Sequence, residues 1–341
     1  MPDGGYRTGF PKKEKMSKRK KTSRVFVLGA GASKACGIPL AGELLRTIIE
    51  ENHLRKKSRV LELLRYLYPR FDARWGNYPN IEEFLSLLES TITFNDKVKT
   101  SHKFQTAEIE GLRDDILMGI AARLLRDDPT QVVLGTPLLS LAALLRPSDV
   151  VVTFNWDLLL EAALFSSGTD NWSYRGSASI PTILKPHGSV DWYDSSKVSF
   201  KGGRSYPLIP KLGHICVYQY FQSPSLKKPV LPIIIPPTFA KEWTKYPEFD
   251  RLWHSASHSL RYADEIYVIG FSLPLEDLHT RFVMRSALRA NEANRGTQLK
   301  LKFVNPDPLA HLRFTHLVDS PVTYFQCGFE KLSLDELTEN K

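Results

Sequence analysis

The sequence predicts an α/β protein with a Rossmann-like, mostly parallel sheet, helices on both faces of that sheet, and a helical insertion. Short apolar segments of strand length alternate with segments of helical spacing along most of the chain. Segments that are apolar throughout are typical of parallel strands that helices cover on both faces. The 341 residues, 42% of them hydrophobic, are enough for a sizeable core.

The first predicted unit is a strand, a glycine turn and a helix. Residues 24–28, Arg-Val-Phe-Val-Leu, form a short apolar strand that runs directly into Gly29-Ala-Gly-Ala-Ser33. Apolar residues at helical spacing then predict a helix over 41–51.

Residues 53–130 change character and predict a helical insertion. Helical spacing occurs over 60–68, 81–88 and 109–125. Asn80 and Glu83 have the spacing of a capping box at the start of a helix. Because β-branched runs are missing here, we expect a cap or subdomain and not a continuation of the sheet.

Two more strands come after the insertion, and each ends in polar residues. Residues 149–154 form a strand that ends in Asn155-Trp-Asp157, and a helix then runs to about residue 165. Residues 182–184 form the next strand, which leads into Lys185-Pro-His-Gly-Ser189.

The remaining chain predicts loops followed by two helix–strand units. Residues 190–225 are rich in Ser, Gly, Tyr and Pro, which favours hairpins and loops, and 230–235 reads as a buried strand. The closing units have helices over 240–262 and 276–291, and strands over 265–269 and 299–304. We expect one domain over 24–330 and a tail over 331–341.

The net charge of +9 is concentrated at the N-terminus. Residues 1–24 hold nine Lys and Arg against two acidic residues, so the rest of the chain carries only about +2. Such a segment cannot bury enough surface to fold, and we expect residues 1–23 to form a disordered basic tail. Contact of this tail with nucleic acid or another polyanion is the alternative.

Composition also excludes several classes of protein. The apolar runs fall short of the roughly 20 residues that cross a bilayer, and the basic start runs into Thr22, Ser23 and a strand-like segment instead of the apolar region of a secretory signal. We therefore expect a cytoplasmic protein with no membrane contact. Cys36, Cys216 and Cys327 have no paired spacing, which predicts neither a disulfide framework nor a metal site.

The glycine turn after the first strand is a candidate phosphate-binding element. Gly29 and Gly31 would let the backbone approach a pyrophosphate and expose N–H groups to it, and Ser33 could add a hydroxyl. Lys34 stands at the third glycine position of the dehydrogenase fingerprint, and no acidic residue follows a second strand about 20 residues later. A hydride-transfer enzyme is therefore disfavoured.

Polar residues at the other strand ends are candidates for the same site, because open α/β sheets bind ligands at the carboxyl ends of their strands. Asn155 could orient a ribose hydroxyl and a water, whereas Asp157 could equally be a helix cap. His187 lies just after a strand and could act near neutral pH. Gly270-Phe-Ser272 and Asn305 follow the last two predicted strands.

The order of these motifs resembles the sirtuin-like superfamily. They are Gly29-Ala-Gly-Ala-Ser33 with Gly37-Ile-Pro39, Thr153-Phe-Asn-Trp-Asp157, His187-Gly-Ser189, Gly270-Phe-Ser272 and Val304-Asn305. The resemblance implies that NAD is bound, that Asn155 and Asp157 line the nicotinamide and ribose pocket, and that His187 is the base. The resemblance also implies that the rest of the dinucleotide is bound by Gly29, Ala30, Gly31, Ala32, Ser33, Gly270, Ser272 and Asn305.

The sequence departs from protein-deacylating sirtuins at two points. The two Cys-x-x-Cys pairs of their zinc module are absent, and Leu40-Ala41 follows Gly37-Ile-Pro39 in place of the usual Asp-Phe-Arg. It is similar instead to the branch found in bacterial antiphage defence, whose members degrade NAD, and Ile81-Glu-Glu-Phe-Leu85 in the insertion fits that branch. The resemblance implies an NAD glycohydrolase that uses no metal, forms a homo-oligomer and works with a partner such as an ATPase or sensor.

Cleavage of the nicotinamide bond requires positioning and charge stabilisation more than a strong acid, since nicotinamide leaves as a neutral molecule. We expect Asn155 to fix the ribose and water, and neutral His187 to accept a proton from the water or a ribose hydroxyl. The alternatives are a non-catalytic sensor of NAD or a related nucleotide, a zinc-free deacylase, and a nucleic-acid module that uses the basic tail.

Overall fold

The computed structural model describes residues 23–98, 103–169, 171–177, 179–199, 205–207, 214–218, 229–236, 246–294 and 298–338. The expected basic tail lies outside the described residues except for Ser23. The suggested contact of that tail with polyanions lies outside them too.

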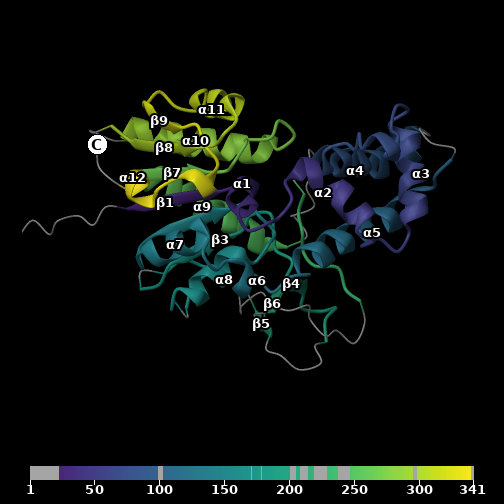
Figure 1. Cartoon of the computed structure of the whole chain (residues 1–341), viewed down its shortest axis with the longest axis horizontal. Helices are drawn as coiled ribbons and strands as arrows, with labels where there is room; N and C mark the ends of the chain where they lie inside the picture. Colours follow the sequence, from purple (N-terminus) through teal and green to yellow (C-terminus); the bar gives the residue numbers. More distant parts are fainter. Residues whose placement is uncertain are drawn as a thin grey trace, which may run out of the picture.

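A six-stranded parallel sheet forms the centre of the molecule (Figure 1), in the order β3-β2-β1-β7-β8-β9. The strands are β1 Arg24–Leu28, β2 Val150–Thr153, β3 Thr182–Leu184, β7 Glu265–Ile269, β8 Lys300–Val304 and β9 Val322–Phe325. From β1 the chain first builds outward to β3 and then returns to build outward to β9 on the other side. The boundary between β1 and β7 is therefore a topological switch point, where such sheets bind ligands.

Helices cover both faces of the sheet, which confirms the predicted α/β fold. Helix α7 contacts α8 and α12, whereas α9 contacts α10. Right-handed crossovers that build in opposite directions from β1 place these two groups on opposite faces. Their bounds are α6 Pro129–Val132, α7 Pro137–Leu144, α8 Leu159–Ser166, α9 Pro247–Tyr262, α10 Leu278–Asn294, α11 Pro308–Thr315 and α12 Leu334–Thr338.

The helical insertion has a core of its own, to the right of the sheet in Figure 1. It contains α2 Ala41–Glu50, α3 Lys57–Leu67, the 3-10 turn Ala73–Trp75, α4 Ile81–Val98 and α5 Thr106–Leu124. Helix α2 packs on α4 and α5, so the packed unit begins before residue 53. Asn80 caps α4, because its Oδ1 accepts the Glu82 N–H at 2.8 Å, whereas Glu83 of the predicted capping box accepts from the Tyr68 hydroxyl at 3.2 Å.

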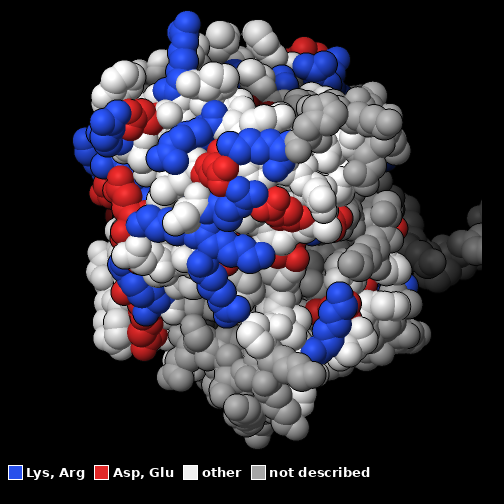
Figure 2. Space-filling view, turned by 90° about the vertical axis from the view of Figure 1, so that its right-hand side faces the viewer, with Lys and Arg blue, Asp and Glu red and all other residues white. Residues whose placement is uncertain are grey.

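The outer face of the insertion has mixed charge. Figure 2 shows Lys and Arg side chains gathered on this side of the molecule with Asp and Glu between them. Arg59 pairs with both Glu62 and Glu108, and Arg113 pairs with Glu89 and Asp114. The Arg59 pairs are the more exposed of these, and exposed pairs contribute little to stability.

The expected strand over 230–235 is wrong. This segment forms only an isolated bridge, between Ile234 and Gly188, and Ile235 donates its N–H to the carbonyl of His187 at 2.8 Å. Its apolar, β-branched sequence resembles a strand, but Pro232 has no N–H to give to a sheet. The segment supports the His187 turn from outside the sheet.

The loop region agrees with the prediction, whereas the end of the chain differs from it. Within 190–225 the expected hairpins are present among the described residues, because β4 Trp192–Asp194, β5 Ser205–Pro207 and β6 Ile215–Tyr218 form a small antiparallel sheet in which β5 pairs with the next strand, β6. Helix α11 and strand β9 were not predicted at all. Within the expected C-terminal tail, α12 buries Leu337 completely. In the described part of the chain no helix is both long and apolar enough to span a membrane.

Candidate functional site

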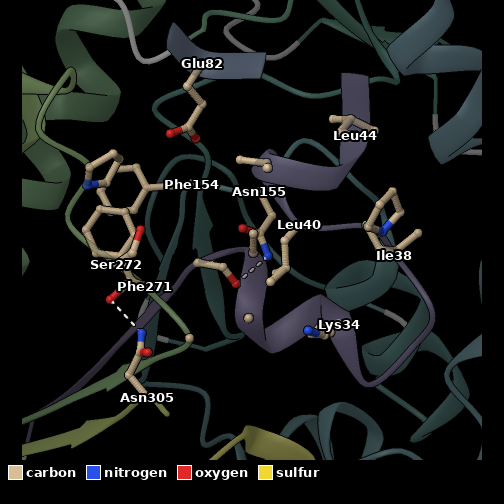
Figure 3. Close-up of a pocket in the computed structure, with 18 of the residues that line it drawn as sticks. Lys34, Ile38, Leu40, Leu44, Glu82, Phe154, Asn155, Phe271, Ser272 and Asn305 are labelled. Atoms are coloured by element: carbon tan, nitrogen blue, oxygen red, sulfur yellow. Dashed lines mark hydrogen bonds between the residues drawn. The ribbon is translucent and has the colours of Figure 1, made fainter. Parts of the chain in front are cut away.

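A cavity of about 590 Å³ opens at the carboxyl ends of the parallel strands, beside the switch point. Loops after β1, β2, β3, β7 and β8 form its floor and walls, and the insertion contributes residues from α2, α4 and α5. Figure 3 shows Glu82 of α4 extending toward the cavity from the insertion, on the side opposite Asn305. The insertion therefore completes a site that the sheet alone would leave open.

Nine of the predicted site residues line this cavity. They are Gly29, Ala30, Gly31, Asn155, Asp157, His187, Gly270, Ser272 and Asn305. Ala32 and Ser33 do not line it, because both are buried behind the glycine turn. Residues that are far apart in the sequence thus meet at one site.

The glycines of the β1 turn are required for close packing. A Cβ on Gly29 would lie 2.5 Å from the Cα of Phe271, and a Cβ on Gly31 would lie 2.7 Å from the Cα of Gly270. Gly270 itself has a φ of +64°, and a Cβ there would lie 2.3 Å from the Ala32 nitrogen. The loops after β1 and β7 therefore touch backbone to backbone.

This packing corrects one expectation about the turn. We expected Gly29 and Gly31 to offer their N–H groups to a pyrophosphate. The Gly31 N–H instead donates to the Gly270 carbonyl at 2.9 Å, and the Gly29 N–H donates to the Ile269 carbonyl at 3.0 Å. These two donors are therefore not available to a ligand.

A chain of hydrogen bonds holds Asn155 in place. Its Nδ2 donates to the Gly29 carbonyl and to Ser33 Oγ, both at 2.9 Å, and Ser33 Oγ donates to Asp157 Oδ2 at 2.8 Å. Figure 3 draws the bond from Asn155 to the Gly29 carbonyl. With both amide hydrogens used, Asn155 can present only its Oδ1 as an acceptor to a ligand.

Asp157 acts mainly through its neighbours. Its Oδ1 accepts the N–H of Leu159, the first residue of α8, at 3.0 Å, while its other oxygen accepts from Ser33. Burial raises the pKa of this carboxyl, and the nearby Lys185 and the hydrogen bonds it accepts act in the opposite direction.

His187 is buried against aromatic rings and a carboxylate. Its ring centroid lies 5.0 Å from that of Phe154 and 5.9 Å from that of Trp253. Its Nε2 lies 3.0 Å from Asp277 Oδ2. The turn that carries it needs glycine at position 188, where φ is +77° and a Cβ would lie 2.0 Å from the Ile233 carbonyl oxygen.

Ser272 and Asn305 form the opposite wall of the cavity. Asn305 Nδ2 donates to the Phe271 carbonyl at 3.3 Å, as Figure 3 shows, and its Oδ1 accepts the Asp307 N–H at 2.9 Å. The Ser272 carbonyl accepts from Arg313 Nε at 2.9 Å. These bonds fix the loops after β7 and β8 relative to each other.

Sequence reasoning missed several residues that line the cavity, including Asp277, Phe271 and the insertion residues Ile81 and Glu82. Asp277 and Thr280 have the spacing of a helix cap, which gave a signal for the start of a helix but none for a contact with His187. In the described residues no group of three or more His, Cys, Asp or Glu side chains could hold a metal ion.

No protein-family model matches the sequence, and no curated protein matches it either. Solved structures similar to this chain include a Sir2 homologue mutant in complex with ADP-ribose, with 17% identity, coverage of 92% of this chain and 90% of that one, and a TM-score of 0.41. A complex of a Sir2 homologue with NAD has 15% identity, 92% and 87% coverage, and a TM-score of 0.39. Sir2Tm bound to a propionylated peptide has 15% identity, 90% and 89% coverage, and a TM-score of 0.35.

Proposed function

We propose that this chain binds NAD in the cavity and hydrolyses its nicotinamide glycosidic bond to give nicotinamide and ADP-ribose. One observation carries the proposal: the side chains of Asn155 and His187, thirty-two positions apart, line the same cavity at the switch point of the sheet. The cavity volume of about 590 Å³ lies within the range of small-molecule sites.

The proposed chemistry assigns a different task to each residue. Cleavage leaves positive charge on the ribose, and an acceptor oxygen can stabilise that charge. A water molecule must then attack the ribose. Asn155 Oδ1 is the acceptor that the hydrogen-bond chain through Ser33 and Asp157 leaves for the ribose or the water. His187 takes the proton released by the attacking water.

The motif order supports a wider proposal about the biological role. According to this wider proposal, the chain is the effector of a bacterial antiphage defence system and acts in the cytoplasm by depleting NAD. It works as a homo-oligomer with a separately encoded partner such as an ATPase or sensor.

Product analysis tests the proposed reaction. We would incubate the purified chain with NAD, with and without the product of the neighbouring gene, and separate the products by chromatography. The expected products are nicotinamide and ADP-ribose. His187→Ala should lower the rate on the order of 10²- to 10⁴-fold without unfolding the protein. His254→Ala, in an exposed histidine of α9 away from the cavity, is the matched control and should leave the rate unchanged.

Three outcomes would contradict the proposal. NAD turnover that survives in folded His187→Ala and Asn155→Ala proteins would refute the assigned residues. NAD that stabilises the protein and stays intact would indicate a sensor. A requirement for an acylated peptide, with acyl-ADP-ribose as product, would indicate a deacylase.

A further inference from the structure

Asp277 makes a buried contact with His187 that has no role in the reaction described above. It lies between the Gly270 loop and the start of α10, ninety positions from His187 in the sequence. Its Oδ2 lies 3.0 Å from His187 Nε2. Asp277 is 0% exposed and His187 is 3% exposed, so bulk water screens this contact poorly.

Capping of α10 explains only part of this arrangement. Asp277 Oδ1 accepts the Thr280 N–H at 3.1 Å, as expected of an aspartate at a helix start. Thr280 Oγ1 also donates to Oδ2, the oxygen that faces the histidine. A cap needs neither complete burial nor an imidazole, and burying a carboxylate is costly unless donors surround it. The second oxygen therefore has a role beyond the helix end.

We propose that Asp277 is the positioning residue of His187, and that His187 Nδ1 is consequently the nitrogen that accepts the proton in the NAD hydrolysis proposed above. This inference rests on that function. An ionised carboxylate can only accept hydrogen bonds, so the nitrogen that faces it must carry a hydrogen. In a neutral imidazole the other nitrogen, Nδ1, is then the basic one.

The surroundings of His187 hold the ring in one orientation. Phe154 and Trp253 pack against the imidazole, and Phe154 also stacks on Phe271 with ring centroids 4.6 Å apart. Thr280 Oγ1 lies 3.4 Å from Nε2 and keeps that edge of the ring next to the α10 start. Packing and the Asp277 contact thus fix the plane of the ring and the position of its proton together.

The step balances without a further reactant. The bond between ribose C1′ and the pyridinium nitrogen breaks, and its electron pair leaves with nicotinamide, which becomes neutral. The oxygen of water bonds to C1′, and its proton moves to His187 Nδ1 before release to solvent. Asp277 stays ionised and stabilises the imidazolium that forms, as the buried aspartate of a catalytic triad does.

Asp277→Asn tests the proposal because asparagine caps helices as well as aspartate does. If the amide oxygen keeps the Thr280 N–H, the amide nitrogen faces His187 and donates to Nε2. The imidazole proton then moves to Nδ1, which can no longer accept. We expect kcat to fall on the order of 10²- to 10⁴-fold, while KM for NAD and the melting temperature change little.

Asp128→Asn is the matched control. Asp128 caps α6, its Oδ1 accepts both the Thr130 N–H and the Thr130 hydroxyl, and it does not line the cavity. Its replacement removes the same charge from the same kind of cap and should leave kcat unchanged. A folded Asp277→Asn protein whose kcat is unchanged or raised would overturn the proposal.

A second measurement does not depend on activity. Nitrogen-15 spectra of labelled ligand-free protein report which ring nitrogen of His187 carries the hydrogen, with His187→Ala to assign the signals. We expect protonated Nε2 and unprotonated Nδ1, and the reverse pattern would overturn the proposal even if Asp277→Asn fails to fold. If the wild-type chain leaves NAD intact, the proposed function fails, and the spectrum alone decides the role of Asp277.

Discussion

Four ionisable side chains are buried together next to the candidate site: Asp157, Glu161, Lys185 and Asp191. Lys185 Nζ donates to Glu161 Oε1 at 3.0 Å and to the Asp157 carbonyl at 2.6 Å. Asp191 Oδ1 has no hydrogen-bond partner among the described residues. Burial raises the pKa of Asp191 to about 7, although Lys185 acts to lower it. This carboxyl therefore makes stability depend on pH.

We predict that Asp191→Asn changes the pH dependence of the free energy of unfolding. Below about pH 4 the carboxyl is protonated in both the folded and the unfolded chain. Between pH 4 and 7 only the unfolded chain releases the proton, so wild-type stability falls as pH rises. The Asp191→Asn variant has no carboxyl at this position, so its stability does not fall in this way. Relative to wild type it should gain a few kcal/mol between pH 5 and 8, since one pKa unit corresponds to about 1.4 kcal/mol.

Denaturant titrations at pH 5 and pH 8 measure this difference, with Asp194→Asn as control. Partial burial acts to raise the pKa of Asp194, but hydrogen bonds from Ser196 outweigh it and the pKa is lowered. Asp194 therefore titrates below the pH window, and its replacement should shift stability equally at both pH values. Parallel profiles for Asp191→Asn and wild type would contradict the assigned pKa.

Some of the site residues could be predicted from the sequence, and others could not. Asn155, His187 and Asn305 each follow an apolar strand, and parallel strands bring such residues to one edge of the sheet. Asp277 carries no comparable local signal. Its contact with His187 depends on how α10 packs after the Gly270 loop, which no short segment encodes.

Among the elements, the contact between the loops after β1 and β7 is the most constrained. Gly29, Gly31 and Gly270 approach one another closely enough that a Cβ on any of them would overlap backbone atoms. The glycine turn was recognisable from the sequence as a tight strand-to-helix connection. The sequence did not indicate that the N–H groups of this turn donate to carbonyls within the protein, because those carbonyls belong to residues about 240 positions away.

We predict that Gly270→Ala is far more destabilising than Gly168→Ala. Both glycines have positive φ, so each substitution incurs the left-handed penalty of about 1–2 kcal/mol. Nothing lies within 4 Å of a Cβ on Gly168, whereas a Cβ on Gly270 overlaps Gly31 and Ala32. Overpacking should add about 1–3 kcal/mol at position 270. Thermal unfolding of both variants checks this, and equal losses would contradict the close packing.

Elements with a clear local pattern were predicted, and those that depend on tertiary context were not. Strands β1, β7 and β8 are rich in apolar residues and were recognised with bounds accurate to about one residue. Strand β9 lies at the edge of the sheet, and its side chains are half-buried or exposed, so its short sequence is less distinctive. The prediction of a strand over 230–235 failed for the opposite reason. The segment is apolar like a strand, but it contains Pro232.

On the scale of the whole molecule, two hydrophobic cores meet at the cavity. The sheet with its helices forms one core, and the insertion forms the other together with Trp156, Leu158, Val190 and Ile234. The sheet brings the glycine turn, Asn155 and His187 together, and the insertion adds Ile81, Glu82 and Leu124 to the walls. The cavity therefore has walls from both parts of the chain, and the contribution of the insertion could not be predicted from the sequence because it depends on how the two parts pack.

A crystal structure of His187→Ala soaked with NAD tests most directly whether one dinucleotide lies between Asn155 and position 187. Slow turnover in this variant should leave the substrate intact. We expect the nicotinamide ribose within hydrogen-bond distance of Asn155 Oδ1 and next to the vacated imidazole position, with the adenosine toward Ser272 and Asn305. NAD bound outside this cavity, or with its nicotinamide ribose remote from both positions, would contradict the proposed function.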